Sequence, residues 1–196
     1  YVVSLLDPSV IEDLELARHG LTILLRTSGH VNIRPDGRLL ALPRVTEAAA
    51  RALEEFSAAD AKAYPEFDRR LEEVGDALRH LLGTPPPNIG GGFGDLMTLL
   101  TTGNTLRRLS PELQGEFAKL MTMSIGDYLD EWFESEAIKG DFGFEGVIGN
   151  FVGPYQAGSA YVLLHHVFGQ VEGKTVAWGH ARGGMGAITQ AMAKSA

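Results

Sequence analysis

The sequence contains no cysteine among its 196 residues, and this absence removes several classes of protein at once. Disulfide-stapled folds, thiolate nucleophiles and cysteine-based metal centres are excluded. No apolar run approaches the roughly 18 residues of a membrane-spanning helix, so we expect no transmembrane segment. Basic residues are also few, with 17 Lys and Arg against 25 Asp and Glu, and they form no block or stripe. We therefore expect no nucleic-acid partner and, because nothing suggests secretion, a cytoplasmic protein.

Charge is unevenly distributed along the chain. Residues 1–141 carry 37 charged side chains, whereas residues 142–196 carry only five, and half of the 24 glycines lie between Gly140 and Gly186. A charge-poor, glycine-rich stretch suits a buried or ligand-facing position better than a solvated surface. If part of it is exposed, a homo-oligomer could form through that apolar surface.

Familiar catalytic and metal motifs are also missing. There is no Gly-x-Ser-x-Gly elbow, so a serine nucleophile has no support. The adjacent pair His165 and His166 would diverge by about 100° on a helix and has no acidic residue one turn on, so we expect no metal site. The carboxylates of residues 127–136 belong to a helical pattern that faces solvent. No catalytic residue can be assigned from the sequence.

Capping and turn residues divide the chain into mostly helical segments. Asp7 and Pro8 begin a helix that we expect to end at Gly20, and residues 21–26 follow as a strand. The sequence around residues 35–37 predicts a hairpin. The expected fold class is α+β: one mostly helical domain over residues 1–196 with a small antiparallel sheet.

Four local expectations concern the helices. Thr46 should cap a helix, and Pro65 should kink or restart the long helix that follows Ser57. Two short helices should be separated near Gly103. Ser159 should cap the apolar segment 160–171.

The last organised feature is a glycine cluster near the end of the chain. Gly183, Gly184 and Gly186 follow a short apolar strand at residues 175–178 and precede a helical pattern. The cluster forms either a simple tight turn or a backbone that closely approaches a flat or phosphorylated group. It lacks the G-x-G-x-x-G spacing and the βαβ setting of a dinucleotide fingerprint.

Several dispersed stretches carry a family resemblance over nearly the whole chain. They are residues 4–8, 13–20, 56–65, 154–169, 178–179 and 183–187. In this order they resemble one branch of the phytoene-desaturase-like flavoproteins, the branch of pyridine nucleotide-disulfide oxidoreductase domain-containing protein 2. In that family such a region lies between two FAD-binding segments. The resemblance therefore implies an internal substrate-domain fragment with the FAD-binding segments missing at both ends.

The resemblance also implies a set of site residues. Those expected near an apolar small-molecule substrate are Pro154, Gly158, Ser159, Tyr161, His165 and Trp178. Those expected at the cofactor are Gly183, Gly184 and Met185. FAD would take hydride from the substrate in the intact protein, and we do not expect FAD in this fragment. The alternative is a non-catalytic helical protein-interaction module.

Overall fold

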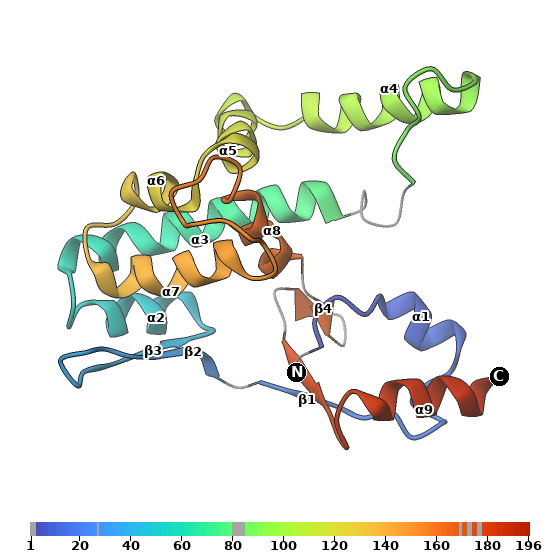
Figure 1. The fold of residues 1–196 in the computed structure, drawn as a ribbon, viewed down its shortest axis with the longest axis horizontal. Helices are drawn as coiled ribbons and strands as arrows, with labels where there is room; N and C mark the ends of the chain where they lie inside the picture. Colours follow the sequence, from blue (N-terminus) through green and yellow to red (C-terminus); the bar gives the residue numbers. More distant parts are fainter. Residues whose placement is uncertain (1–2, 27, 80–84, 169, 172–173, 176–177) are drawn as a thin grey trace.

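The molecule is a mostly helical α+β structure, as the sequence predicted (Figure 1). A computed structural model of the chain describes residues 3–26, 28–79, 85–168, 170–171, 174–175 and 178–196. The helices are α1 (Pro8–Asp13), α2 (Thr46–Leu53), α3 (Ala58–Arg79), α4 (Phe93–Arg107), α5 (Pro111–Thr122), α6 (Ile125–Asp130), α7 (Glu136–Val147), α8 (Tyr161–Val167) and α9 (Gly186–Ser195). The strands are β1 (Ile23–Leu25), β2 (Ser28–Ile33), β3 (Leu39–Pro43), β4 (Gln170–Val171), β5 (Lys174–Thr175) and β6 (Gly179–Ala181). Within the described ranges they form antiparallel pairs β1–β6, β2–β3 and β4–β5.

Helix α3 is the centre of the larger hydrophobic core. Its apolar residues recur every three or four positions, so Phe67 and Leu71 lie on one buried face. The Phe67 ring packs edge-on against Phe133 and Phe142, with centroid distances of 4.8 Å and 5.2 Å. Pro65 lies inside this continuous helix, so the helix does not restart there, and a kink at Pro65 stays a prediction. Burial of the apolar face outweighs the local cost of the missing proline N–H.

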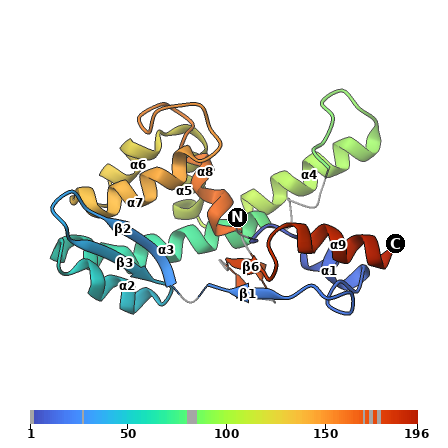
Figure 2. The same ribbon diagram turned by 60° about the horizontal axis from the view of Figure 1, so that its bottom comes forward.

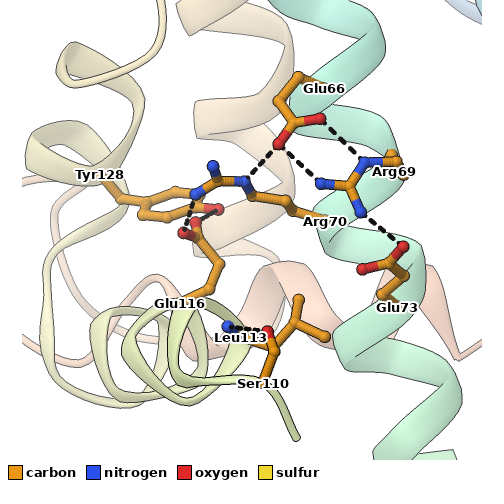
Figure 3. A network of polar contacts seen from close by, with 8 residues as sticks. All are labelled: Glu66, Arg69, Arg70, Glu73, Ser110, Leu113, Glu116 and Tyr128. Atoms are coloured by element: carbon orange, nitrogen blue, oxygen red, sulfur yellow. Dashed lines mark hydrogen bonds and ion pairs between the residues drawn. The ribbon is translucent and has the colours of Figure 1, made fainter.

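A polar network joins α3, α5 and α6 at the edge of this core (Figure 3). The Tyr128 hydroxyl donates to Glu116 Oε1 at 2.5 Å, and Arg70 Nη1 lies 3.3 Å from Glu116 Oε2. Burial and the hydrogen bond to this carboxylate raise the pKa of Tyr128. Glu116 is only 3% exposed, and a buried carboxylate is tolerated when a cation and a donor satisfy it. The network therefore fixes the spacing of three helices.

The predicted hairpin forms as β2 and β3. Its turn includes Gly37 at φ +84°, a left-handed conformation that favours glycine. Strand β3 leads into α2, whose N-cap is Val45 and not the predicted Thr46. The Thr46 hydroxyl instead donates to Asp68 at 2.6 Å, and so connects the start of α2 to α3.

A second, smaller hydrophobic cluster forms where β1 and β6 pair and α1 and α9 lie nearby (Figure 2). Its buried residues are Val3, Leu16, Leu21, Ala181, Ile188 and Ala191. Helix α1 begins at the predicted Asp7 cap but ends at Asp13, well before the predicted end at Gly20. Glu15 adopts φ +47° just after the helix. The chain turns there, and Leu16 is fully buried in the smaller cluster.

Helix α4 is a single helix across Gly103, so the predicted division into two short helices is wrong. One glycine inside a helix costs only about 1 kcal/mol, which neighbouring turns can absorb. The strand before the glycine cluster is β6, later than the predicted residues 175–178, of which 176–177 lie outside the described residues. None of the described helices has both the length and the apolar character needed to cross a bilayer.

Candidate functional site

A cavity of about 230 Å³ lies between helix α3 and the β2–β3 hairpin. Helices α7 and α8 contribute further walls, and Trp178 reaches the cavity from the residue before β6. The lining residues are Arg26, Gly29, His30, Leu42, Pro43, Arg44, Tyr64, Asp68, Leu71, Glu72, Phe142, Glu145, Leu163, Val167 and Trp178. Apolar and charged side chains are thus mixed in one cavity, and they come from elements that are distant in the sequence.

The α3 wall presents two carboxylates. Tyr64, Asp68, Leu71 and Glu72 lie at helical spacing on one face, so all four reach the cavity. Burial raises the pKa of Asp68, although its hydrogen bond from Thr46 acts in the opposite direction. Burial and the neighbouring Asp68 charge raise the pKa of Glu72. A positively charged group in the cavity would relieve the cost of both carboxylates.

The opposite wall contains His30 between two carboxylates of α7. His30 Nδ1 lies 3.0 Å from Asp141 Oδ2, and Nε2 lies 2.9 Å from Glu145 Oε1. The two acids are one turn apart, and their side chains are 8% and 7% exposed. Hydrogen bonds to Asp141 and Glu145 raise the His30 pKa to about 10, against the opposing effect of burial. At neutral pH the ring is therefore an imidazolium, and both of its N–H groups donate to carboxylates.

These groups can bind and orient a ligand. His30 already holds a proton and both of its nitrogens are engaged, so it is not a general base at neutral pH. Phe142 and Leu163 offer apolar contact beside the charged groups. Across the described part of the chain, no group of three or more His, Asp and Glu residues is placed to hold a metal ion.

Three of the predicted site residues belong to the region of α8 and the cavity. Trp178 lines the cavity together with Leu163 and Val167. Tyr161 begins α8, is 39% exposed, and does not line the cavity. His165 falls in α8, but its side chain lies outside the described part of the chain.

Three others form a loop that packs on the start of α6. The Ser159 hydroxyl is fully buried and accepts from Ile125 N at 2.9 Å. Gly158 has φ +82° and donates its N–H to Met123 O at 2.9 Å, while the Pro154 carbonyl accepts an N–H of α6 at 2.8 Å. Ser159 does not cap α8, because the N-cap residue of this helix is Ala160. These contacts hold the loop against α6 and away from the cavity lining.

The predicted cofactor residues form an exposed turn between β6 and α9. Gly183 and Gly184 have φ of +89° and +85°, and Gly184 N donates to Ala181 O at 2.9 Å. Met185 is 41% exposed. An added Cβ at Gly184 would meet no described atom within 4 Å, so the turn is open toward solvent. None of these residues lines the cavity.

Sequence reasoning did not find the charged residues of the cavity. One usable signal was present: Asp141 and Glu145 lie four residues apart, and Glu145 is among the few charges of residues 142–196. A carboxylate in an apolar, glycine-rich segment needs a partner when it is buried. The residues near Asp141 in the sequence do not indicate which residue this partner is, because His30 is 111 residues away from Asp141.

The sequence is similar to two curated mammalian proteins. It is 35% identical to pyridine nucleotide-disulfide oxidoreductase domain-containing protein 2 of Rattus norvegicus and to the protein of the same name of Mus musculus. Each alignment of 214 residues covers all of this chain and 36% of the relative, so the chain spans about a third of their length. No family profile and no solved structure matches. The expected resemblance to proteins of this name is confirmed, and the wider placement among phytoene-desaturase-like flavoproteins stays a prediction.

Proposed function

We propose that this chain is the substrate-binding part of an FAD-dependent oxidoreductase. The relatives carry an oxidoreductase domain in their names, and the chain corresponds to about a third of their length. The remaining part of such a protein would hold most of the cofactor. The role of this chain would be to receive the substrate and to close over the flavin ring.

The observation that carries this proposal is the link between the cavity and the glycine turn. Trp178 lines the cavity, strand β6 follows it directly, and the turn at Gly183 follows the strand. A strand of three residues spans about 10 Å. A flat group lying along β6 would therefore contact the turn at one end and the mouth of the cavity at the other.

The residues of the turn fit the edge of a flavin ring. Gly183 and Gly184 expose backbone without side chains, and Met185 offers an exposed apolar side chain beside them. FAD, when bound, supplies the acceptor for hydride. The described chain shows no glycine-rich phosphate loop between a strand and a helix of a βαβ unit, so this chain would not hold the pyrophosphate.

The cavity suggests a substrate with an apolar body and one polar end. Leu163, Phe142 and Trp178 would hold the apolar body and exclude water. Asp68 and Glu72 would orient the polar end, while His30 keeps its proton between two acids. Since typical ligand pockets enclose about 300–1,000 Å³, a cavity of about 230 Å³ suits one end of such a molecule.

The test is Gly184→Val in a protein that carries this chain together with the FAD-binding segments that the proposal requires. A β-branched residue at φ +85° strains the turn and fills the space that the ring would occupy. We expect flavin absorbance per protein, or turnover, to fall at least several-fold. Gly37→Val is the matched control, because Gly37 has φ +84° and equally open surroundings in the hairpin turn. Equal flavin content and turnover in both variants would show that Gly184 is an ordinary turn residue.

A second test uses the 196-residue chain itself. Purified as these 196 residues alone, it should be colourless, and added FAD should not remain bound through gel filtration. Near-stoichiometric flavin in the purified chain would contradict the division of the cofactor site that we propose.

The alternative, a non-catalytic interaction module, is favoured by one feature. Helix α4 has no buried residue and exposes several large apolar side chains. An exposed apolar helix is compatible with either function, because enzymes also assemble through such surfaces.

A further inference from the structure

Helix α4 extends away from the helical body (Figures 1 and 2). None of its 15 residues is buried. Five of its six large apolar side chains are between 40% and 78% exposed: Phe93, Leu96, Met97, Leu99 and Leu100. The sixth, Leu106, lies near the end of the helix and packs against the larger core. Exposed apolar area on this scale in one element is typical of an interaction surface.

Three of these five exposed side chains lie on one face of α4, and Met97 and Leu99 flank that face on either side. Intervals of three and four residues place one set of side chains along a single face of α4: Phe93, Leu96, Leu100, Gly103 and Arg107. This interval pattern is that of a helix that pairs with another helix. This face is bulky in its first half and slim in its second half.

The opposite face of α4 is made of threonines. The hydroxyls of Thr98, Thr101 and Thr105 donate to backbone carbonyls four residues back, at 3.1, 3.0 and 3.1 Å. No charged side chain lies between Asp95 and Arg107. Helices that bind membrane surfaces carry Lys and Arg on their polar face, and the chain has a net charge of −8. A protein partner fits α4 better than a lipid surface does.

We propose that α4 pairs antiparallel with the α4 of a second copy of this chain, crossing at Leu100. An antiparallel pair places the bulky half of each helix on the slim half of its partner. A parallel pair would instead place Arg107 beside the same arginine of the second copy. Isologous contacts of this kind are the commonest way in which identical chains assemble.

The antiparallel arrangement pairs bulky side chains with slim or basic ones at two levels. About the Leu100 crossing, the Phe93 ring faces the Arg107 guanidinium of the other copy, a cation–π pair. Met97 lies opposite Gly103, where an added Cβ would meet no described atom within 4 Å. The helix dipoles of an antiparallel pair oppose one another, which favours this direction.

The area is sufficient for a weak dimer. Five partly exposed large apolar side chains present on the order of 500 Å² per copy. Two copies would bury about 1,000 Å², which is near the lower limit for a specific interface. We therefore expect a dimer that dissociates on dilution.

Cysteine cross-linking tests the pairing and its direction, because the chain has no native cysteine to interfere. Leu100→Cys should give a covalent dimer on mild oxidation, since the two residues meet at the crossing. Phe93→Cys alone should not form a covalent dimer, because residues 93 of the two chains would lie about 21 Å apart. A mixture of Phe93→Cys and Arg107→Cys chains should give the mixed dimer.

Thr98→Cys is the control, because Thr98 lies on the opposite face of α4 from Leu100. Cross-linking of Thr98→Cys as efficient as that of Leu100→Cys would mean random collision and would overturn the pairing. Efficient self-cross-linking of Phe93→Cys would overturn the antiparallel direction.

Sedimentation equilibrium of the chain provides a second readout. The unsubstituted chain should be a concentration-dependent dimer. Leu100→Glu should raise the dimer dissociation constant at least tenfold, whereas Thr98→Glu should leave this constant unchanged. A chain that stays monomeric at high concentration would overturn the proposal. Binding of that monomer to phosphatidylcholine vesicles would then identify lipid as what covers α4.

Discussion

Helices α3 and α4 follow one another in the chain, yet they end in opposite environments. Eight of the 22 residues of α3 are buried, whereas none of the 15 residues of α4 is. Both have apolar residues at helical spacing, but those of α3 are concentrated on one face far more strongly than those of α4. The polar residues of the two helices differ as well. The outer face of α3 carries ion pairs, with Arg69 bonded to Glu66 at 2.7 Å and to Glu73 at 2.5 Å, whereas α4 presents threonines. An apolar stripe backed by charge is covered by its own chain here, and an apolar stripe backed by neutral hydroxyls is left exposed.

The largest expected effect comes from the centre of the covered helix. Phe67→Ala should lower the free energy of unfolding by about 3–5 kcal/mol, because the ring is fully buried among other aromatic rings. Urea titration followed by circular dichroism measures it. A loss below about 1 kcal/mol would mean that α3 is not the centre of the core.

The next largest loss of stability is expected at the cavity wall. His30→Ala should cost about 2–3 kcal/mol near neutral pH, because it leaves Asp141 and Glu145 buried without their shared cation. The His30 pKa is raised from 6.5 to about 10, so its contribution is fully present below about pH 6.5 and is lost as the pH rises through about 10. Unfolding free energies measured across this range should fall in the native chain more than in the variant. Parallel pH profiles would rule out the imidazolium link.

A smaller effect should come from the buried network of α5 and α6. Tyr128→Phe removes the hydroxyl that donates to Glu116, and should cost about 1–2 kcal/mol. Tyr155→Phe is the matched control, because its hydroxyl lies 3.2 Å from Asp130 on a residue that is 64% exposed. Chemical denaturation should separate the two. Equal losses of unfolding free energy in the two variants would mean that the burial of Glu116 does not strengthen its hydrogen bond with Tyr128.

The smallest effect should come from the exposed helix. Phe93→Ala, measured at a concentration where the chain is monomeric, should change the free energy of unfolding by no more than about 0.5 kcal/mol. The same substitution at Phe67 thus differs from it by several kcal/mol. A large loss at Phe93 in the monomer would show that α4 folds back on its own chain.

Local chemistry predicted the positions of several elements well. The cap at Asp7 is formed as expected, by a side chain that accepts an N–H from the first turn of its helix. Ser110 and Ser124 cap α5 and α6 in the same way. The hairpin around Gly37 is likewise a local matter of turn conformation. Such features depend on a few neighbouring residues and are therefore visible in the sequence.

Predictions failed where a capping residue found a distant partner. Thr46 bonds Asp68 and Ser159 bonds Ile125, so neither caps its own helix. The cavity also depends on a distant partner, because His30 and Asp141 are 111 residues apart in the sequence. Of the predicted site residues, Trp178 lines the cavity, whereas the charged wall was not foreseen.

One long-range contact closes the segment of the chain that contains α4, and this closure depends little on the length of the segment. The buried Asp60 carboxylate at the start of α3 accepts from Glu134 N at 2.8 Å and from Ser135 N at 3.0 Å, across 74 and 75 residues. This contact ties the two ends of the segment that contains α4. The entropy of closing so long a loop varies only with the logarithm of its length, so about 20 added residues would change it by only about 0.2 kcal/mol. This segment can therefore be lengthened, shortened or used to carry an inserted tag while the body around α3 keeps its closure.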